Sequence, residues 1–154
     1  MIFLARYVVA GAAGAASTTA ATAGIIKVDN AATILSVPKI FEWSIGPGAA
    51  AEDSNYTIRN KTQTTAGTWT SATPAALDPA SAAAKASGGI ASTAAGSAGT
   101  ILGYWGFNQR AGYRWVAVPG GEFYVPRANS NGIIWEYVVI QGTAINYGSV
   151  FFDE

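Results

Sequence analysis

The sequence contains no cysteine and no histidine, and these two absences remove most catalytic and metal-binding chemistry. Without cysteine there is no disulfide scaffold and no thiol nucleophile, and without either residue a Cys/His zinc site cannot form. A Ser–His–Asp triad is likewise impossible within this chain. We therefore expect no catalytic, cofactor-binding or metal-binding residues, and we interpret the protein as a non-enzyme.

Charged residues are also scarce in this sequence. Charged residues make up 12% of the 154 residues, and nine basic residues balance nine acidic ones. Soluble proteins average roughly 25% charged residues. Binding to a phosphate backbone needs clustered cations, so we expect no nucleic-acid partner. A surface with so few charges favours contact with other protein over contact with water.

A long hydrophobic run is also lacking. Residues 1–23 are apolar on average, but Arg6 interrupts them and they continue into Gly, Ala, Ser and Thr. A spanning helix needs about 20 predominantly apolar residues, so we expect no membrane partner. A cleaved signal peptide fits poorly, because apolar residues precede the cation. We interpret residues 1–24 as an N-terminal strand or arm, with a strand over residues 2–9.

Period-two alternation dominates wherever a pattern is present, which indicates β-strands. The alternating segments are residues 39–45, 55–61, 112–118 and 133–140. In the first of them, Phe41, Trp43 and Ile45 share one face. Gly-, Pro- and Asn-rich turns separate these segments, and the length suits one domain. The sequence therefore predicts a single all-β domain over residues 1–154, an antiparallel β-sandwich of jelly-roll-like type with a long Ala/Gly/Ser-rich loop or arm.

That loop or arm is residues 76–100, which are rich in small side chains. Residues 80–86 are suited to two helical turns, with Pro79 near the start and Gly88 after the end. A flexible small-residue loop fits the composition equally well. An arm lying on a neighbouring subunit would also explain so long a segment. The sequence leaves loop, short helix and arm open.

Carboxylate pairs are the remaining acid/base option. Glu42 and Glu136 both lie on predicted strands, opposite the aromatic face. A glycosidase would need two carboxylates at a defined separation, and either Glu→Gln change would then abolish turnover. Simple alternation instead favours charges that face solvent or an interface. Three other acidic groups are too exposed or too small for a site: Glu52-Asp53, Asp153-Glu154 and Asp29-Asn30.

Aromatic residues are plentiful and suggest a stacking platform for sugars or bases. The set is Trp43, Trp69, Tyr104, Trp105, Phe107, Tyr113, Trp115, Trp135 and Tyr137. Alternation places most of them in a β core, and base stacking would need a basic groove. Trp69 is the best candidate for an exposed ring. An alternative function is therefore a carbohydrate- or receptor-binding module of a phage fibre or adhesin, with glycan binding lost on Trp69→Ala.

One part of the chain carries a resemblance. The segments FEWSI (residues 41–45) and YTIR (56–59) precede QTTAGT (63–68) and TPAALDP (73–79), and an Ala/Ser-rich tail follows. This order resembles small structural proteins encoded beside the capsid genes of tailed bacteriophages, the head decoration (cement) type. The likeness covers residues 39–84, rests on loop composition and brings no catalytic residues with it.

The resemblance implies a virion structural protein that binds and stabilises the phage head shell. Its partners would be the major capsid protein and further copies of itself, with a trimer favoured. It would be assembled in the host cytoplasm and would lie on the capsid exterior. We expect the N-terminal strand and residues 76–100 to carry these contacts.

Overall fold

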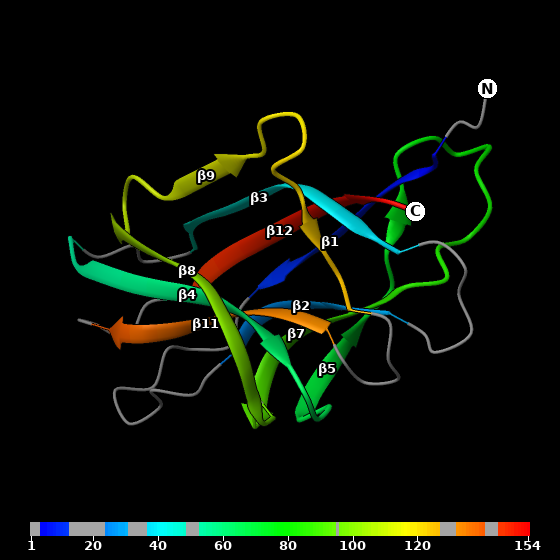
Figure 1. Ribbon diagram of the computed structural model, residues 1–154. Coiled ribbons are helices and arrows are strands. Elements are labelled where there is room, and N and C mark those ends of the chain that lie inside the picture. Colours follow the sequence, from blue (N-terminus) through cyan, green and yellow to red (C-terminus); the bar gives the residue numbers. More distant parts are fainter. Residues whose placement is uncertain are drawn as a thin grey trace.

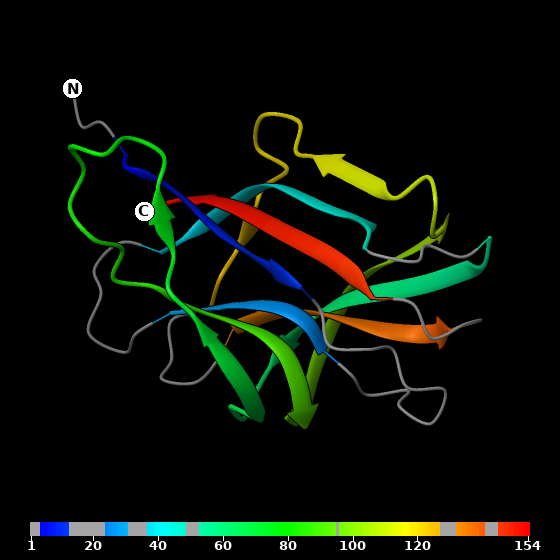
Figure 2. The same ribbon diagram turned by 180° about the vertical axis from the view of Figure 1, so that it is seen from behind.

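The computed structural model describes residues 4–12, 24–30, 37–48, 53–94, 96–126, 132–140 and 145–154 (Figure 1). These residues form twelve strands and no helix. Among them, therefore, no helical segment has the length and apolar character that crossing a membrane requires. The strands build two antiparallel sheets packed face to face, as Figure 2 shows from the opposite side.

Each sheet has six strands. The first sheet contains β1 (Arg6–Ala12), β3 (Lys39–Pro47), β6 (Ala75–Ala76), β9 (Tyr113–Val116), β10 (Phe123–Tyr124) and β12 (Asn146–Asp153). The second sheet contains β2 (Gly24–Asp29), β4 (Asn55–Gln63), β5 (Thr68–Ala72), β7 (Ser87–Ala94), β8 (Ala98–Asn108) and β11 (Gly132–Ile140). The strand orders are β10-β3-β12-β1-β6, with β9 also on β3, and β5-β7-β2-β11-β4-β8.

The connectivity is that of a jelly roll. The first strand pairs with the last, β1 with β12, and the next pairs nest inside it: β2 with β11, β3 with β9 and β10, and β4 with β8. These four nested antiparallel pairs alternate between the first and the second sheet. Such an alternation is typical of a jelly roll. The predicted all-β sandwich is confirmed.

Strands β5, β6 and β7 are an insertion between β4 and β8. β7 lies between β2 and β5 in the second sheet, and the two-residue β6 extends the first sheet beside β1. The prediction of a loop, short helix or arm over residues 76–100 is therefore wrong for β7 and for the start of β8. No helix forms over residues 80–86, which are described throughout. Here pairing on both edges of β7 overrides weak local propensity.

The core lies between the sheets. Its largest fully buried side chains are Trp43, Trp135, Tyr56, Tyr137 and Phe152. The side chains of β3 do not alternate strictly between core and surface. The pairing of β3 with β12 shifts by one residue between Phe151 and Phe152, so Phe41 is an extra, bulged residue with no partner on β12. Phe41 therefore faces outward beside Phe151 while Ile40 is buried, which corrects the predicted face.

The N-terminal strand is present as β1, from Arg6 to Ala12, in place of the predicted residues 2–9. Residues 1–3 and 13–23 lie outside the described residues. β1 lies between β12 and β6, and β7 lies between β2 and β5, so neither of these strands is an edge strand of its sheet.

One core residue gives the fold a pH dependence. Tyr137 is fully buried and its hydroxyl accepts a hydrogen bond from Asn146 Nδ2 at 2.8 Å. Burial raises the pKa of Tyr137 to about 12, because the phenolate would be poorly solvated. In the unfolded chain the pKa is ~10, so the native state holds this proton more tightly. The resulting stability is complete below pH ~10 and is lost as pH rises through ~12.

We therefore expect the free energy of unfolding to fall by about 2–3 kcal/mol more in the wild type than in Tyr137→Phe between pH 9 and 12. Urea unfolding of both proteins at each pH measures this difference, and the contributions of lysine and the other tyrosines cancel. Parallel pH profiles for the two proteins would contradict the assignment.

Candidate functional site

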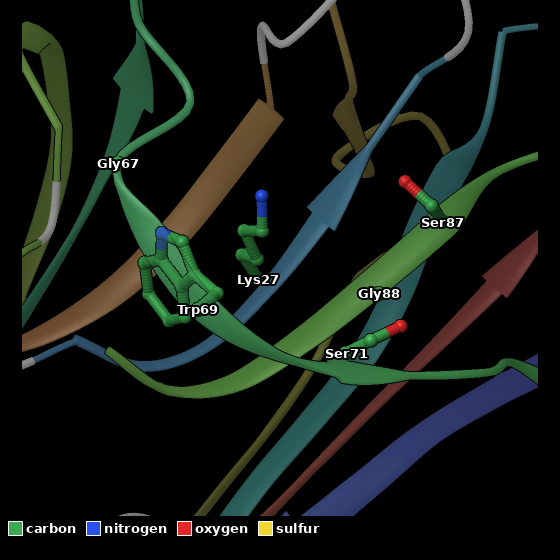
Figure 3. A pocket seen from close by; sticks show the side chains of 6 residues that line it. All are labelled: Lys27, Gly67, Trp69, Ser71, Ser87 and Gly88. Atoms are coloured by element: carbon green, nitrogen blue, oxygen red, sulfur yellow. The ribbon is translucent and has the colours of Figure 1, made fainter. Parts of the chain in front are cut away.

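A small pocket opens on the outer face of the second sheet, over β2, β5 and β7 (Figure 3). Its volume is about 250 Å³, and its lining consists of Lys27, Gly67, Trp69, Ser71, Ser87 and Gly88. The Lys27 ammonium lies 5.5 Å from the centroid of the Trp69 ring and forms an ion pair with Asp29. The pocket therefore combines one aromatic ring, a neutralised charge pair and two hydroxyls.

Glycines let Trp69 lie close to the sheet. A Cβ at Gly24 would lie 2.0 Å from Cη2 of Trp69. A Cβ at Gly89 would lie 2.8 Å from Cε of Lys27 and 3.0 Å from Cβ of Trp69. A larger residue at Gly24 would displace the ring, and one at Gly89 would displace the Lys27 side chain or the Trp69 Cβ. Trp69, predicted as the exposed aromatic, is half-buried because its ring is turned onto the sheet.

A second charged group lies on the same outer face. Glu136 is fully buried and its Oε1 accepts from Arg59 Nε and, at 2.8 Å, from Lys61 Nζ. Burial lowers the pKa of Arg59, but the hydrogen bond and charge of Glu136 outweigh burial, so this pKa lies above its usual value. Glu136 is thus held as the counter-ion of two cations, and it does not face solvent as alternation predicted.

The other predicted carboxylate, Glu42, lies on the first sheet. Its neighbours are Phe151 and Val116, and it accepts from Arg114 Nε at 2.7 Å and Nη2 at 3.0 Å. Those two bonds raise the pKa of Arg114. Glu42 and Glu136 point outward from opposite faces of a sandwich whose sheets pack ~10 Å apart. The structure does not bring them together as a glycosidase pair.

The remaining acidic candidates form no shared site. Asp29 pairs with Lys27, Asp53 accepts from Asn108 Nδ2 at 2.5 Å, and Glu52 lies outside the described residues. At the chain end, Asp153 pairs with Arg6 and Glu154 accepts from the Lys85 backbone N–H. In the part of the chain that the structure describes, no three acidic side chains gather in a way that could hold a metal ion.

Most of the predicted aromatic set belongs to the core, as expected. Trp43, Trp135 and Tyr137 are buried, and four others pack against the core while partly buried: Trp105, Phe107, Tyr113 and Trp115. Tyr104 and Trp69 are the exceptions, and Tyr104 has 56% of its surface exposed on the outer face of the second sheet. Its strand partner on β4 is Arg59, and its hydroxyl contributes to the raised pKa of that guanidinium. Tyr104 is therefore the exposed ring that the sequence pattern missed.

The outer face of the first sheet is open and mainly apolar. Strand registers place eight uncharged side chains on it: Val8, Ala10, Phe41, Ser44, Val116, Tyr147, Ser149 and Phe151. Val116 and Tyr147 are 52% and 53% exposed. The Arg6–Asp153 and Arg114–Glu42 ion pairs lie on the same face, so both of those carboxylates are already neutralised. We call this surface the first-sheet face.

Comparison of the chain with protein-family models, with curated proteins and with solved structures found no match in any of the three. The small pocket at Trp69 and the first-sheet face are two of the surfaces that the described residues offer for binding. A second pocket of about 470 Å³ lies between the start of β1 and the loop after β6, lined by residues that include Leu4, Leu77 and Asp78. Sequence reasoning did not find Lys27 and Asp29 as a pair. Their i, i+2 spacing on a strand, which places both side chains on one face, was the available signal.

Proposed function

We propose that this protein is a virion structural protein of a tailed bacteriophage, a capsid decoration or cement protein on the exterior of the head. Its partner is the major capsid protein, and its role is to stabilise the shell. The first-sheet face is the observation that carries this proposal, because it offers a protein partner apolar area at low desolvation cost. The resemblance over residues 39–84, which form β3 to β6 and the loops around them, adds the capsid context.

Two ion pairs on the first-sheet face favour burial against a protein, and the further cation Lys39, opposite Asp153, lies with its ammonium 5.6 Å from the centroid of the Tyr124 ring. Glu42 makes two hydrogen bonds to Arg114, at 2.7 and 3.0 Å, and Asp153 lies 3.2 Å from Arg6. Charges that are already paired lose less on desolvation than isolated ones. Between these pairs, Ala10, Ser44 and Ser149 form a row of small side chains across three strands, which lets a partner backbone approach closely.

The size of the face suits a protein contact. Strands β1, β3 and β12, with seven, nine and eight residues, and the four-residue β9 make up the face. At a spacing of ~4.8 Å and a rise of ~3.4 Å per residue they give an area on the order of 450 Å². A standard interface buries about 800 Å² on each partner, so this face would supply much of one contact. The pocket at Trp69, at about 250 Å³, is too small for a protein segment.

Carbohydrate binding is the second candidate, and the pocket at Trp69 is its support. Trp69, Ser71 and Ser87 combine a ring with hydroxyls, and the volume of about 250 Å³ accommodates a single sugar ring. Stacking on a sugar requires an open ring face, however, and the Trp69 ring is turned onto Gly24 and Lys27. The geometry therefore favours the structural function over the sugar-binding one.

Co-sedimentation with empty heads, built from the capsid protein of the same phage, tests the proposal. We expect the wild type to pellet with heads and the double variant Val116→Glu/Tyr147→Glu to lose at least about tenfold in affinity, roughly 1.4 kcal/mol. Both side chains are more than half exposed, so the variant should fold normally. The matched control is Trp69→Ala on the other sheet, which should bind heads like the wild type.

Two results would oppose the proposal. One is a wild type that stays in the supernatant with undecorated heads. The other is loss of binding in Trp69→Ala with full binding in Val116→Glu/Tyr147→Glu, which would move the contact to the pocket. Circular dichroism of each variant establishes that the fold is intact before binding is compared.

A further inference from the structure

Strand β8 forms a long free edge of the second sheet. It is eleven residues long and lies last in the order β5-β7-β2-β11-β4-β8. Its pairing among the described residues is with β4 on one side, which leaves its other edge without a strand. Figure 1 shows β8 passing in front of β4 along the side of the sandwich. A free strand edge presents unpaired N–H and C=O groups to any strand of matching shape.

The other edges of the molecule are short, and β8 is the exception. Edge strands β6 and β10 have two residues each, β9 has four and β5 has five. Natural proteins protect long edges with lysine, proline or bulges. The β8 segment AGTILGYWGFN contains no charged residue and no proline. Its protection is limited to register shifts opposite Lys61, in the half that precedes Gly103.

The half from Gly103 to Asn108 is regular. It pairs with residues 60 down to 55 of β4 in one unbroken register, so it is a straight segment of about 20 Å. On its outward side lie Tyr104, which is 56% exposed, and Gly106. A Cβ at Gly106 would meet nothing nearer than the Tyr56 carbonyl oxygen at 4.0 Å. The fold of the single chain therefore gives Gly106 no packing reason to lack a side chain.

We propose that the free edge of β8 pairs antiparallel with β8 of a second copy of this chain, across a twofold axis at Trp105. Residues directly opposite in an antiparallel pair share one face of the sheet. A register centred on Trp105 places Tyr104 opposite the partner's Gly106 and Gly103 opposite the partner's Phe107. The partner's Tyr104 ring thus fills the open space at Gly106, whereas Gly103 is already covered by Trp105 of its own chain, whose Cη2 lies 2.4 Å from the position of a Cβ there. Residues 103–107 form the segment that pairs with itself.

Charge and area also favour a second copy as the occupant. Lysines on an edge strand prevent two identical strands from pairing, because their charges repel. The β8 segment has no charged residue, so no such repulsion opposes its pairing with a second copy. The side of the sandwich that contains β8 also contains β9, since Trp43 contacts both Trp105 and Tyr113. Three of the ten exposed large hydrophobic side chains among the described residues lie on β8 itself: Ile101, Leu102 and Tyr104.

The area available reaches that of a specific contact. A register centred on Trp105 overlaps residues 102–108 of the two β8 strands, roughly 24 Å, and two packed sheets are roughly 20 Å thick, which gives on the order of 500 Å² per copy. A specific interface should bury at least about 1,000 Å² in total over both partners. This inference does not depend on head binding, because it uses the β8 edge and leaves the first-sheet face free. It predicts a dimer where the phage resemblance implies a trimer.

Light scattering coupled to size exclusion tests the pairing. We expect the wild type at about twice the chain mass of 15.8 kDa, and Gly106→Lys at the monomer mass with an unchanged circular dichroism spectrum. Lysine at Gly106 has open space in the single chain but would bury its charge beside the partner's Tyr104. Thr70→Lys on the exposed edge strand β5 is the matched control and should remain dimeric.

Cross-linking tests the register. The chain has no cysteine, so Tyr104→Cys and Gly106→Cys each introduce a single thiol. Mixed and oxidised together, the two variants should form a disulfide-linked dimer, whereas each variant alone should not, because residues 104 and 106 oppose each other across the axis. A wild-type monomer or trimer, a dimer that Gly106→Lys leaves intact, or a mixture that forms no cross-link overturns the proposal.

Discussion

Replacing Glu136 by Gln should destabilise the protein by about 3–5 kcal/mol, a large part of a typical domain stability of about 5–15 kcal/mol. The Glu136 side chain is 0% exposed, and its partner Lys61 is 5% exposed with Nζ 2.8 Å from Oε1. Glutamine keeps the shape and an oxygen acceptor but removes the negative charge. The Lys61 ammonium, and Arg59 at 25% exposure, then remain with no counter-ion.

Two further variants test whether the loss of stability comes from removing a buried counter-ion or from removing any carboxylate. Glu42→Gln removes the corresponding charge from the first-sheet face, where its partner Arg114 is 66% exposed, so the unfolding midpoint should barely move. Glu136→Gln with Lys61→Met should be more stable than Glu136→Gln alone, because the unpaired ammonium is gone.

Urea unfolding followed by tryptophan fluorescence measures the effect of all three variants. Equal losses in Glu136→Gln and Glu42→Gln, or a double variant less stable than Glu136→Gln, would contradict a role for Glu136 as a buried counter-ion. The same measurement bears on how the second sheet is stabilised, because Arg59, Lys61 and Glu136 join β4 to β11.

Alternation predicted which way Glu136 points but not that it is buried. The face of a strand follows from a period of two, which is a local property of the sequence. Trp135 and Tyr137 face the core, so Glu136 faces outward, as predicted. Burial on the outward face depends on Arg59 and Lys61 from β4, which are far away in sequence, and a single segment does not encode them.

The small-residue segment 76–100 also shows why local sequence is insufficient. Residues 76–100 were expected to be a loop, a helix or an arm, yet Gly88 lies in the middle of the packing between the two sheets. A Cβ at Gly88 would lie 2.6 Å from the Ala72 carbonyl oxygen and 2.6 Å from Cγ2 of Val9. A segment without large side chains is typical of a flexible linker, but it is also what close approach of backbones requires.

The sequence predicted some properties of the candidate surfaces and missed others. Scarce charge raised the expectation of contact with other protein, which stays a prediction, and the first-sheet face is an open, mainly apolar surface that would suit such contact. The segments expected to carry the contacts include β1 and β7, which are interior strands of their sheets because sheet order is set by pairing over long sequence distances. Most of the aromatic set lies in or against the core, as expected; the exceptions are Trp69, which lies on the outer face of the second sheet, and Tyr104, whose exposure follows from the position of β8 at the sheet edge.

Trp43→Ala should cost about 3–5 kcal/mol, since it removes the largest ring that joins the two sheets. Trp43 on β3 is 1% exposed, and its ring centroid lies 5.1 Å from that of Trp105 on β8 and 6.0 Å from that of Trp135 on β11. Deleting the indole leaves a cavity lined by rings that cannot collapse without moving a sheet. Denaturant unfolding, with intact native circular dichroism, measures the loss.

Phe41→Ala is the matched control, and it separates the observed fold from simple alternation. Alternation along β3 makes Phe41 and Trp43 equivalent core residues, so both substitutions would cost several kcal/mol. In the structure the bulge turns Phe41 outward, under the Arg6 guanidinium at 5.2 Å and beside Phe151 at 6.4 Å. Half-burial of a phenylalanine is worth about 1 kcal/mol, so Phe41→Ala should be far milder than Trp43→Ala. Losses of equal size in the two variants would place Phe41 in the core and would contradict the bulge, whereas a large difference supports the register on which the first-sheet face depends.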